Sequence, residues 1–360
     1  MENFIGVVQA FLANIGLISA ENNPRHKITP AGMFRALMEN PATIEIANLQ
    51  RLKEGKDADI VVRYLQRSIE SDTQDTDDCD VQPSVVWKES KVEKPFFTKK
   101  TIYIPDDEMA KYQNAATQPM IIGSEGARVM TGFYEVVLSQ LNGIIQKINS
   151  NLLSSQTANW GVNTPYGSSA PQTINFSNTP TLDDGIVKLL LDYQANEGAG
   201  VPLVVGNGAV TAYDTLQALK VGVDSGGFGA NQLNVYPDLG SISKWGANHF
   251  GLFMPGLVGF VDYNRNTGAF AGAKGSSIFF TMPVPVQLAG GAYSQLVFDC
   301  QLKYFDCPIK DEDGVVLAER GYALIVGKRY GLWNAPSDMF KAGDRLAGMN
   351  GSLHYVGATA

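Results

Sequence analysis

The residue types that most often carry enzyme chemistry are scarce in this chain and are not grouped. It has three histidines, and none forms an H-x-x-x-H pair or lies near a G-x-S-x-G turn. Serine-hydrolase triads and zinc-protease helices therefore lack their usual parts. We expect His26, His249 and His354 to have structural roles.

Two glycine-containing segments match nucleotide-binding turns only in part. Residues 205–208 (VGNG) begin like a dinucleotide fingerprint, but Thr211 occupies the third glycine position and no acidic residue ends a following strand about 20 residues later. Residues 272–276 (GAKGS) lack the spacer and the Gly-Lys pair of a phosphate loop. We expect a tight strand–helix turn at 205–208, set the 272–276 segment aside as a phosphate loop, and expect no cofactor.

The cysteines and acidic residues do not predict a metal site. Three cysteines are too few and too scattered for a disulfide framework, and an odd count suits a reducing compartment. Cys300 and Cys307 are seven residues apart on a predicted strand, so their side chains point to opposite faces. An acidic run lacks the glycine and terminal glutamate of an EF-hand, and we interpret it as a solvated face or an electrostatic contact. The run consists of Glu70, Asp72, Asp75, Asp77, Asp78 and Asp80.

The composition bounds the class of protein. With 360 residues, 44% hydrophobic and 18% charged, the chain can build two or three cores. A net charge of -8 argues against wrapping nucleic acid directly, so any enclosed nucleic acid would be held by confinement. No apolar run approaches ~18 residues and the N-terminus lacks a basic signal region, which predicts a soluble protein made inside the cell.

The elements that must position any site begin with one long helix. Ser124 is a good N-cap, Glu125 suits the first turn, and no proline occurs between Pro119 and Pro165, which predicts a helix over 124–155. Its apolar stripe is Met130, Tyr134, Val137, Leu141, Ile144, Ile148 and Leu152. Small residues form a second line, either a solvent face or a place where another backbone packs closely. These are Gly132, Ser139, Gly143 and Ser150.

A basic stretch lies between two predicted strands, 85–87 and 101–104. The polar residues between them predict a projecting hairpin. Its lysines are Lys88, Lys91, Lys94, Lys99 and Lys100.

The remaining pattern predicts an extended N-terminal region and a mixed C-terminal half. Residues 1–20 form an amphipathic helix pattern, followed by short helical pieces to about residue 65, which is typical of an arm. A helix, a strand and a second helix are expected at 181–193, 202–205 and 209–220, and strands at 249–262, 276–288 and 295–305. The last strand alternates between apolar residues and Asp299, Gln301 and Lys303.

In this order the elements resemble the tailed-phage major capsid proteins of the Hong Kong 97 fold family. The resemblance covers most of the chain and lies in element order, without a short diagnostic motif. It implies an α+β fold with an N-terminal arm (1–65), an extended hairpin or E-loop region (66–115), a peripheral domain (116–180 and 286–360) with a spine helix (124–155), and an inserted axial α/β domain (181–285).

The resemblance also implies a function. The chain would be a major capsid protein and not an enzyme, forming hexamers and pentamers of an icosahedral shell that encloses the phage genome without sequence-specific DNA binding. It would be made in the host cytoplasm and would reside in the virion. Its partners would be further copies of itself, with scaffold, portal and decoration proteins as possible additions, and no membrane.

Specific subunit contacts follow as hypotheses. The hairpin lysines would meet acidic surface of a neighbouring subunit, including Asp75, Asp77 and Asp78, and the helix would meet another segment at Gly132 and Gly143. A solvated lysine-rich loop is the simpler interpretation of the hairpin. Some members of the family form lysine–asparagine cross-links, but nothing in this sequence selects a pair.

Two other functions stay open. An encapsulin-like bacterial compartment shell would share the fold and hold protein cargo in place of DNA. An α/β enzyme would use the turn at 206–208 and the loop at 222–229 around a ligand. The missing acid–base set weighs against that alternative.

Overall fold

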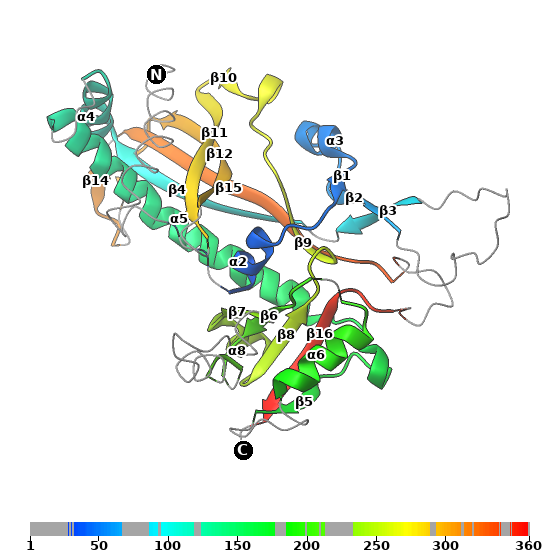
Figure 1. Cartoon of the computed structure of the whole chain (residues 1–360). Coiled ribbons are helices and arrows are strands. Elements are labelled where there is room, and N and C mark those ends of the chain that lie inside the picture. Colours follow the sequence, from blue (N-terminus) through cyan, green and yellow to red (C-terminus); the bar gives the residue numbers. More distant parts are fainter. Residues whose placement is uncertain are drawn as a thin grey trace.

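Figure 1 shows a computed structural model of the chain. It describes residues 28, 30, 32–66, 86–92, 95–118, 124–176, 185–198, 200–208, 210–212, 233–288, 293–310, 313–318, 320–337, 339, 346 and 348–358. The helix predicted at 1–20, most of the helix predicted at 209–220, and the loop at 222–229 lie outside the described residues.

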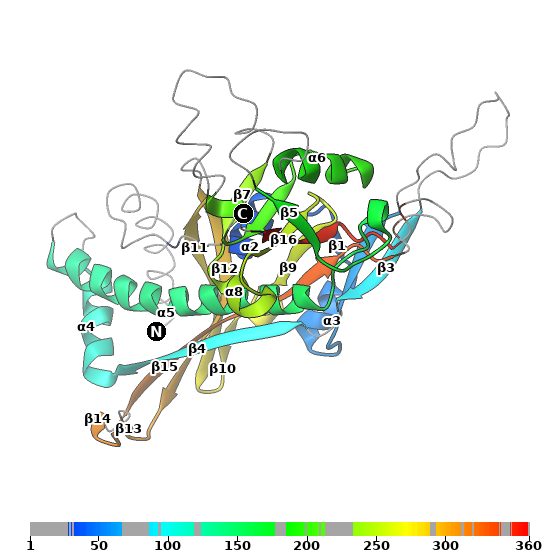
Figure 2. The same ribbon diagram turned by 90° about the horizontal axis from the view of Figure 1, so that it is seen from below.

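Helix α5 (Glu125–Thr157) is the longest element and confirms the helix predicted over 124–155. Its 33 residues rise about 50 Å at ~1.5 Å per residue. Ser124 caps the first turn, since its hydroxyl accepts a hydrogen bond from the Ala127 backbone N–H at 3.3 Å. Every residue of the predicted apolar stripe is at most 2% exposed. Figure 2 shows α5 running along most of the length of the body.

A large sheet lies against α5. Its strand order is β10-β11-β12-β15-β4, and β9 pairs with the far end of β15. The strands are β4 (Phe96–Pro105), β9 (Val258–Tyr263), β10 (Gly272–Lys274), β11 (Ser277–Gln287), β12 (Tyr293–Phe305) and β15 (Gly321–Asn334). The alternation predicted for 295–305 is confirmed, because Leu296, Phe298, Cys300 and Leu302 are buried in the core that includes α5.

A second sheet is formed by β5-β16-β8-β6-β7. The strands are β5 (Gln172–Asn175), β6 (Leu203–Gly206), β7 (Asn234–Pro237), β8 (His249–Phe253) and β16 (Ser352–Ala358). Strand β6 is buried at every position and alternates between two cores: Leu203 and Val205 share one core with α5, whereas Val204 packs with the second core.

Helices cover both faces of the second sheet. Helix α6 (Gly185–Ala195) supplies Leu189 and Tyr193 to one face. Helices α2 (Gly32–Glu39) and α8 (Gly240–Trp245), with the C-terminal part of α5, lie on the other face. The chain is therefore a mixture of helices and strands, as the expected α+β class requires.

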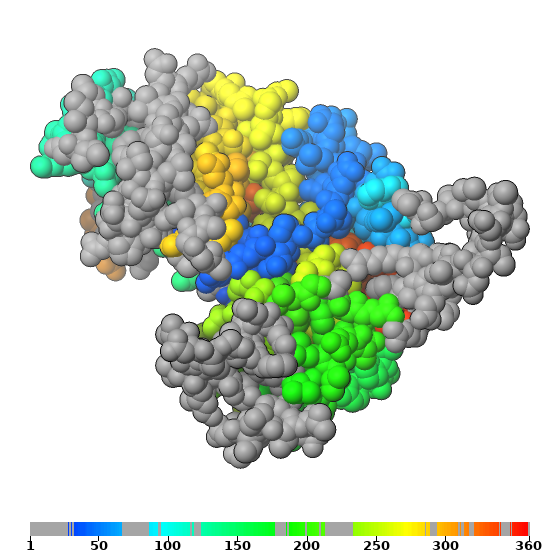
Figure 3. Space-filling model, viewed as in Figure 1, coloured from blue at the N-terminus to red at the C-terminus, as the bar shows by residue number. Residues whose placement is uncertain are grey.

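The segment from residue 32, which is expected to be part of an arm, packs into the body. In Figure 3, α2 (blue, centre) lies between the large sheet (yellow and orange) and the green elements around the second sheet. Met33 and Phe34 are fully buried. Their backbone N–H groups donate to Asp238 Oδ2 (3.1 Å) and Asn149 Oδ1 (2.9 Å). The sequence pattern predicted short helical pieces in this segment, but it did not predict that they are buried.

The predicted hairpin pairing is wrong. Strand β3 (Trp87–Val92) pairs with β2 (Ile60–Leu65), and β1 (Glu45–Ile46) completes a three-stranded sheet. The second predicted strand, 101–104, lies in β4 and pairs with β15. Its apolar residues Ile102 and Ile104 are buried with α5, which a projecting hairpin could not provide.

One further strand prediction is wrong. The expected strand 249–262 is two strands, β8 in the second sheet and β9 in the large one. The expected domain boundary at 285/286 falls inside β11, and β16 pairs with β8. Short elements complete the fold: α3 (Leu49–Glu54), α4 (Asp106–Ala116), η3 (Thr164–Tyr166), η4 (Gly268–Phe270), β13 (Ile309–Lys310) and β14 (Val316–Ala318).

Candidate assembly surfaces

The base of the β2–β3 hairpin is anchored on the end of β15. The indole N–H of Trp333 donates to Ser90 Oγ at 2.9 Å, and its ring lies 6.0 Å from that of Tyr64. Val92 covers Gly331, where an added Cβ would come within 2.5 Å of Val92 Cγ1. The hairpin therefore leaves the body from a packed base.

The outer face of this hairpin exposes apolar surface. Leu65 and Trp87 are cross-strand partners, 39% and 51% exposed. The Arg63 guanidinium lies 5.3 Å from the Trp87 ring centre, a cation–π geometry. Large apolar side chains exposed together are typical of a contact surface.

The four described lysines of the predicted hairpin do not form one patch. Lys88 and Lys91 lie on opposite faces of β3, because they are an odd number of residues apart on a strand. Lys99 and Lys100 alternate in the same way on β4, in a different sheet. Lys94 lies outside the described residues, as do Asp75, Asp77 and Asp78. The proposed contact between these groups stays a prediction.

The line of small residues on α5 has no packing partner among the described residues. Gly132 and Gly143 are exposed, and a Cβ added at either would meet no described atom within 4 Å. In the described part of one copy, these two glycines therefore lie on a solvent face. A contact there with another copy stays a prediction.

The face of the large sheet opposite α5 holds a groove of about 410 Å³. We call it the basic groove, because four cationic side chains and one carboxylate line it. The charged residues are Lys99, Arg265, Lys274, Arg329 and Asp299, and the apolar lining includes Phe97, Phe270, Phe279 and Ile325. A second hollow of about 260 Å³ shares Phe97, Arg265 and Arg329 with it and extends the surface towards α3.

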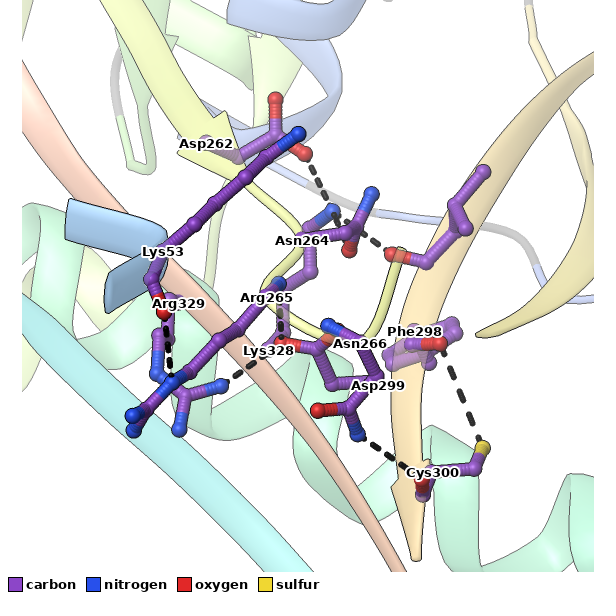
Figure 4. Close-up of polar contacts among 11 residues, drawn as sticks. Lys53, Asp262, Asn264, Arg265, Asn266, Phe298, Asp299, Cys300, Lys328 and Arg329 are labelled. Carbon is purple, nitrogen blue, oxygen red and sulfur yellow. Dashed lines mark hydrogen bonds and ion pairs between the residues drawn. The ribbon is translucent and has the colours of Figure 1, made fainter. Parts of the chain in front are cut away.

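The Asp299 carboxylate positions two segments that line the groove (Figure 4). This carboxylate is 4% exposed and accepts three hydrogen bonds. Arg329 Nη1 donates at 2.6 Å, and the backbone N–H groups of Arg265 and Asn266 donate at 2.9 Å each. One buried carboxylate thus fixes a loop and an arginine from two different elements.

Aromatic rings position the other cations. The Arg329 guanidinium lies 4.1 Å from the ring centre of Phe97. The same ring packs directly over Gly327, where an added Cβ would lie 2.7 Å from Phe97 Cε2. Lys274 Nζ lies 5.6 Å and 5.8 Å from the ring centres of Phe270 and Phe279. These cation–π contacts hold positive charge at the groove without neutralising it.

Lys328, the residue before Arg329, points away from the groove and is fully buried. Its ammonium pairs with Asp262 and donates to Asn264 Oδ1 at 3.2 Å and Val297 O at 2.6 Å (Figure 4). All three donors have acceptors, so this charge is a structural tie between β15, β12 and the end of β9.

The sequence prediction missed the basic groove because its cations come from separate segments. Arg265 and Arg329 are single basic residues among uncharged neighbours or beside structural ones. Two features of the sequence could have indicated the groove. One is the polar alternation of Asp299, Gln301 and Lys303, and the other is Lys274 in the segment that partly matches a phosphate loop.

The histidines pair with each other in the second sheet. His249 Nδ1 lies 3.0 Å from His354 Nε2, and Trp160 stacks on His354 at 4.3 Å between ring centres. Burial, with a smaller contribution from His249, lowers the pKa of His354 to about 4. Across the described residues no group of three or more His, Cys, Asp or Glu could hold a metal ion.

A second buried network surrounds Asp192, on the same sheet's α6 side. Burial raises the pKa of this carboxyl group, against hydrogen bonds from Tyr355, Asn163 and Tyr166 that lower it. Tyr355 Oη donates to Asp192 Oδ2 at 3.1 Å. The network ties α6 to β16.

The turn at residues 206–208 is a packing feature. Gly206 ends β6, and an added Cβ would lie 2.4 Å from Phe250 Cβ. Close packing of β6 on β8 explains this glycine. None of the helices in the described part of the chain is long and apolar enough to cross a membrane.

The sequence matches no protein-family model and no curated protein. Among solved structures, the chain is similar to one from Mycobacterium phage Bobi, with 9% identity, 92% of this chain and 93% of that chain covered, and a TM-score of 0.44. A structure from Mycobacterium phage Adephagia gives 11% identity, 92% coverage of each chain and a TM-score of 0.44. The capsid structure of cyanophage P-SCSP1u gives 11% identity, 92% and 90% coverage, and 0.38.

Proposed function

We propose that this chain is the major capsid protein of a tailed phage, and that its copies assemble into hexamers and pentamers of a closed shell around the genome. Its role is structural and not enzymatic. It is made in the host cytoplasm and resides in the virion, where scaffold, portal and decoration proteins are further partners.

The observation that carries this proposal is the β2–β3 hairpin. It is anchored by Trp333 at its base and exposes Leu65 and Trp87 on its outer face. An isolated two-stranded extension has little stability of its own in water, so an anchored one with apolar surface suits a contact with another molecule. Shell subunits need such reaching contacts because each copy must hold several neighbours.

The arrangement of the sheets supports an assignment of domains. The large sheet with α5 corresponds to the peripheral domain, and the second sheet with α6 corresponds to the axial domain. The β2–β3 hairpin corresponds to the E-loop, which moves the expected E-loop strands from 85–104 to 60–92. Residues before α2 remain for an arm.

Two subunit contacts belong to the proposal. Trp87, Leu65 and the lysines of β3, Lys88 and Lys91, lie on the hairpin that reaches a neighbouring copy. The exposed line of Gly132 and Gly143 on α5 lies against a segment of another copy.

Electron microscopy of the expressed chain tests the function. We expect closed icosahedral shells, or pentamers and hexamers, and only monomers at every salt concentration would contradict the proposal. Trp87→Ser should reduce particle yield while leaving the monomer folded, since Trp87 is 51% exposed. Leu239→Ser, at 79% exposure and distant from the hairpin, is the matched control. Genomic DNA in native particles distinguishes a capsid from an encapsulin-like shell with protein cargo.

A further inference from the structure

The basic groove has charge that the described chain does not neutralise. Lys99, Arg265, Lys274 and Arg329 face one carboxylate, Asp299, and the protein as a whole carries -8. Asp299 bonds Arg329, whereas Lys99 and Lys274 make no ion pair with any described carboxylate. A cluster of cations in a hollow with aromatic walls strengthens the field there and favours an anionic occupant.

The groove is also built in advance of any occupant. Three hydrogen bonds hold the Asp299 carboxylate, and Arg265 Nε donates to Lys53 O at 2.9 Å. Phe97 and Phe279 each carry a cation at one ring face. Because these side chains are already positioned, an anionic occupant loses less free energy in ordering them.

The chain itself contains a segment of the required charge. Glu70 to Asp80 has six carboxylates and no basic residue. It lies within the connection 66–86 between β2 and β3, whose strands lead away from the large sheet (Figure 1). At ~3.3–3.6 Å per residue, a connection of this length reaches about 30 Å out and back, enough to meet another copy.

We propose that the basic groove of one copy binds the acidic run, residues 70–80, of a second copy. Carboxylates of Asp75, Asp77 and Asp78 pair with Lys99 and Lys274 at the exposed side of the groove. The pairing rests on the proposed function, since it names the surface on which the hairpin of a second copy docks. From the sequence that surface is expected to be acidic, whereas the basic groove is positively charged. A nucleic acid strand is the less favoured occupant, because the cations already cover ring faces that bases would need for stacking.

A charge swap tests the pairing in the full chain. Lys99→Glu with Lys274→Glu should lower particle yield about tenfold, because it places like charges together. Both lysines are exposed and outside the Asp299 cluster, so the unfolding transition of the unassembled chain should shift only by the small loss of the exposed cation–π contacts of Lys274. Adding Asp75→Lys, Asp77→Lys and Asp78→Lys to the same chain should restore the yield. Wild-type yield from the double variant, or no restoration in the swap, would overturn the proposal.

A matched charge control and a peptide titration distinguish a specific pairing from a general effect of net charge. Lys111→Glu with Lys147→Glu makes the same change in net charge on exposed helix positions and should leave the yield within about twofold of wild type. A synthetic peptide of residues 69–81 should bind the unassembled wild-type chain, more weakly in high salt, and not bind the Lys99→Glu/Lys274→Glu variant.

The shell function and the groove pairing fail in different ways. If the wild-type chain forms no particles, the shell function fails, and the peptide titration still decides whether the groove takes the acidic run. If particles form but the peptide does not bind, the groove assignment fails while the shell function stands. Binding of a single-stranded oligonucleotide with no peptide binding would assign the groove to nucleic acid and overturn the proposal.

Discussion

The two sheets of this chain are covered to different extents. The second sheet has helices on both faces, and its strand β6, which lies between β8 and β7, is buried throughout. The large sheet has α5 on one face, and its other face exposes Tyr103 (58%) and Phe97 (47%). The second sheet therefore completes its core within one copy, whereas the large sheet leaves one face for a contact. The following substitutions test that difference.

The largest effect is expected on the helix side of the large sheet. Phe298→Ala should lower the free energy of unfolding by about 3–5 kcal/mol, because Phe298 is fully buried against the α5 core. Tyr103→Ala on the open face should cost less than about 1 kcal/mol. Urea titration of both variants measures the contrast, and equal losses would show that the open face is as important to the monomer as the covered one.

A second effect comes from the buried carboxylate of Asp299 on the open face. Asp299→Asn keeps the shape but removes the charge that Arg329 and two backbone N–H groups share, which should cost about 2–4 kcal/mol. Asp306→Asn, at an exposed position of the next turn, should change the urea midpoint little. If Asp299→Asn left the free energy of unfolding unchanged, this carboxylate would not be what stabilises the basic groove.

The second sheet should carry a pH dependence. Burial lowers the pKa of His354 to about 4 from an unfolded value near 6.5, so the unfolded chain binds the extra proton between these values. Stability contributed by the neutral ring is present above pH 6.5 and is lost as pH falls towards 4. The loss should be about 1–2 kcal/mol after allowance for partial solvent access.

Hydrogen exchange localises this effect. Amide protection in β8 and β16 should fall over that pH range in the wild-type chain, and His354→Gln should flatten the dependence. An equal response in β12 would mean that the two sheets open together and would weaken the distinction between them.

The smallest effect concerns α5, which contacts both sheets. Gly143→Ala should raise the unfolding free energy of the unassembled chain by up to about 1 kcal/mol, since no described atom lies near the added Cβ. Gly143→Leu should be equally well folded but should impair assembly if another copy packs there. Gln146→Leu is the control at an exposed position on the same helix. If Gly143→Leu formed normal particles, no other copy would pack against this position, and the line of small residues would be a solvent-exposed face.

Local patterns in the sequence predicted the regular elements well. The Ser124 cap, the stripe of α5 and the alternation of β12 each depend on neighbours within one element, and the structure confirms them. Strand pairing depends on partners far away. Nothing near Ile102 indicates that it lies opposite Leu324, so β4 was assigned to a hairpin.

The basic groove shows the same limit at the level of a site. Its cations come from β4, β10, β15 and the loop after β9, and only the sheet register brings them together. Counting lysines along the sequence found Lys99 but grouped it with Lys88 and Lys91, which lie in another sheet. The partner of a charged residue cannot be chosen without that register.

The pairing of β4 with β15 also determines how late during synthesis on the ribosome the large sheet can form. The two strands are more than 200 residues apart, so the large sheet closes only after residue 334 has been synthesised. Until then the apolar stripe of α5 lacks much of its cover, for on the order of ten seconds or more at ~5–20 residues per second. An uncovered apolar stripe on a nascent chain is the kind of surface that chaperones bind, and strands so far apart in sequence pair slowly. The time for which α5 stays uncovered is thus set by how late β15 is made.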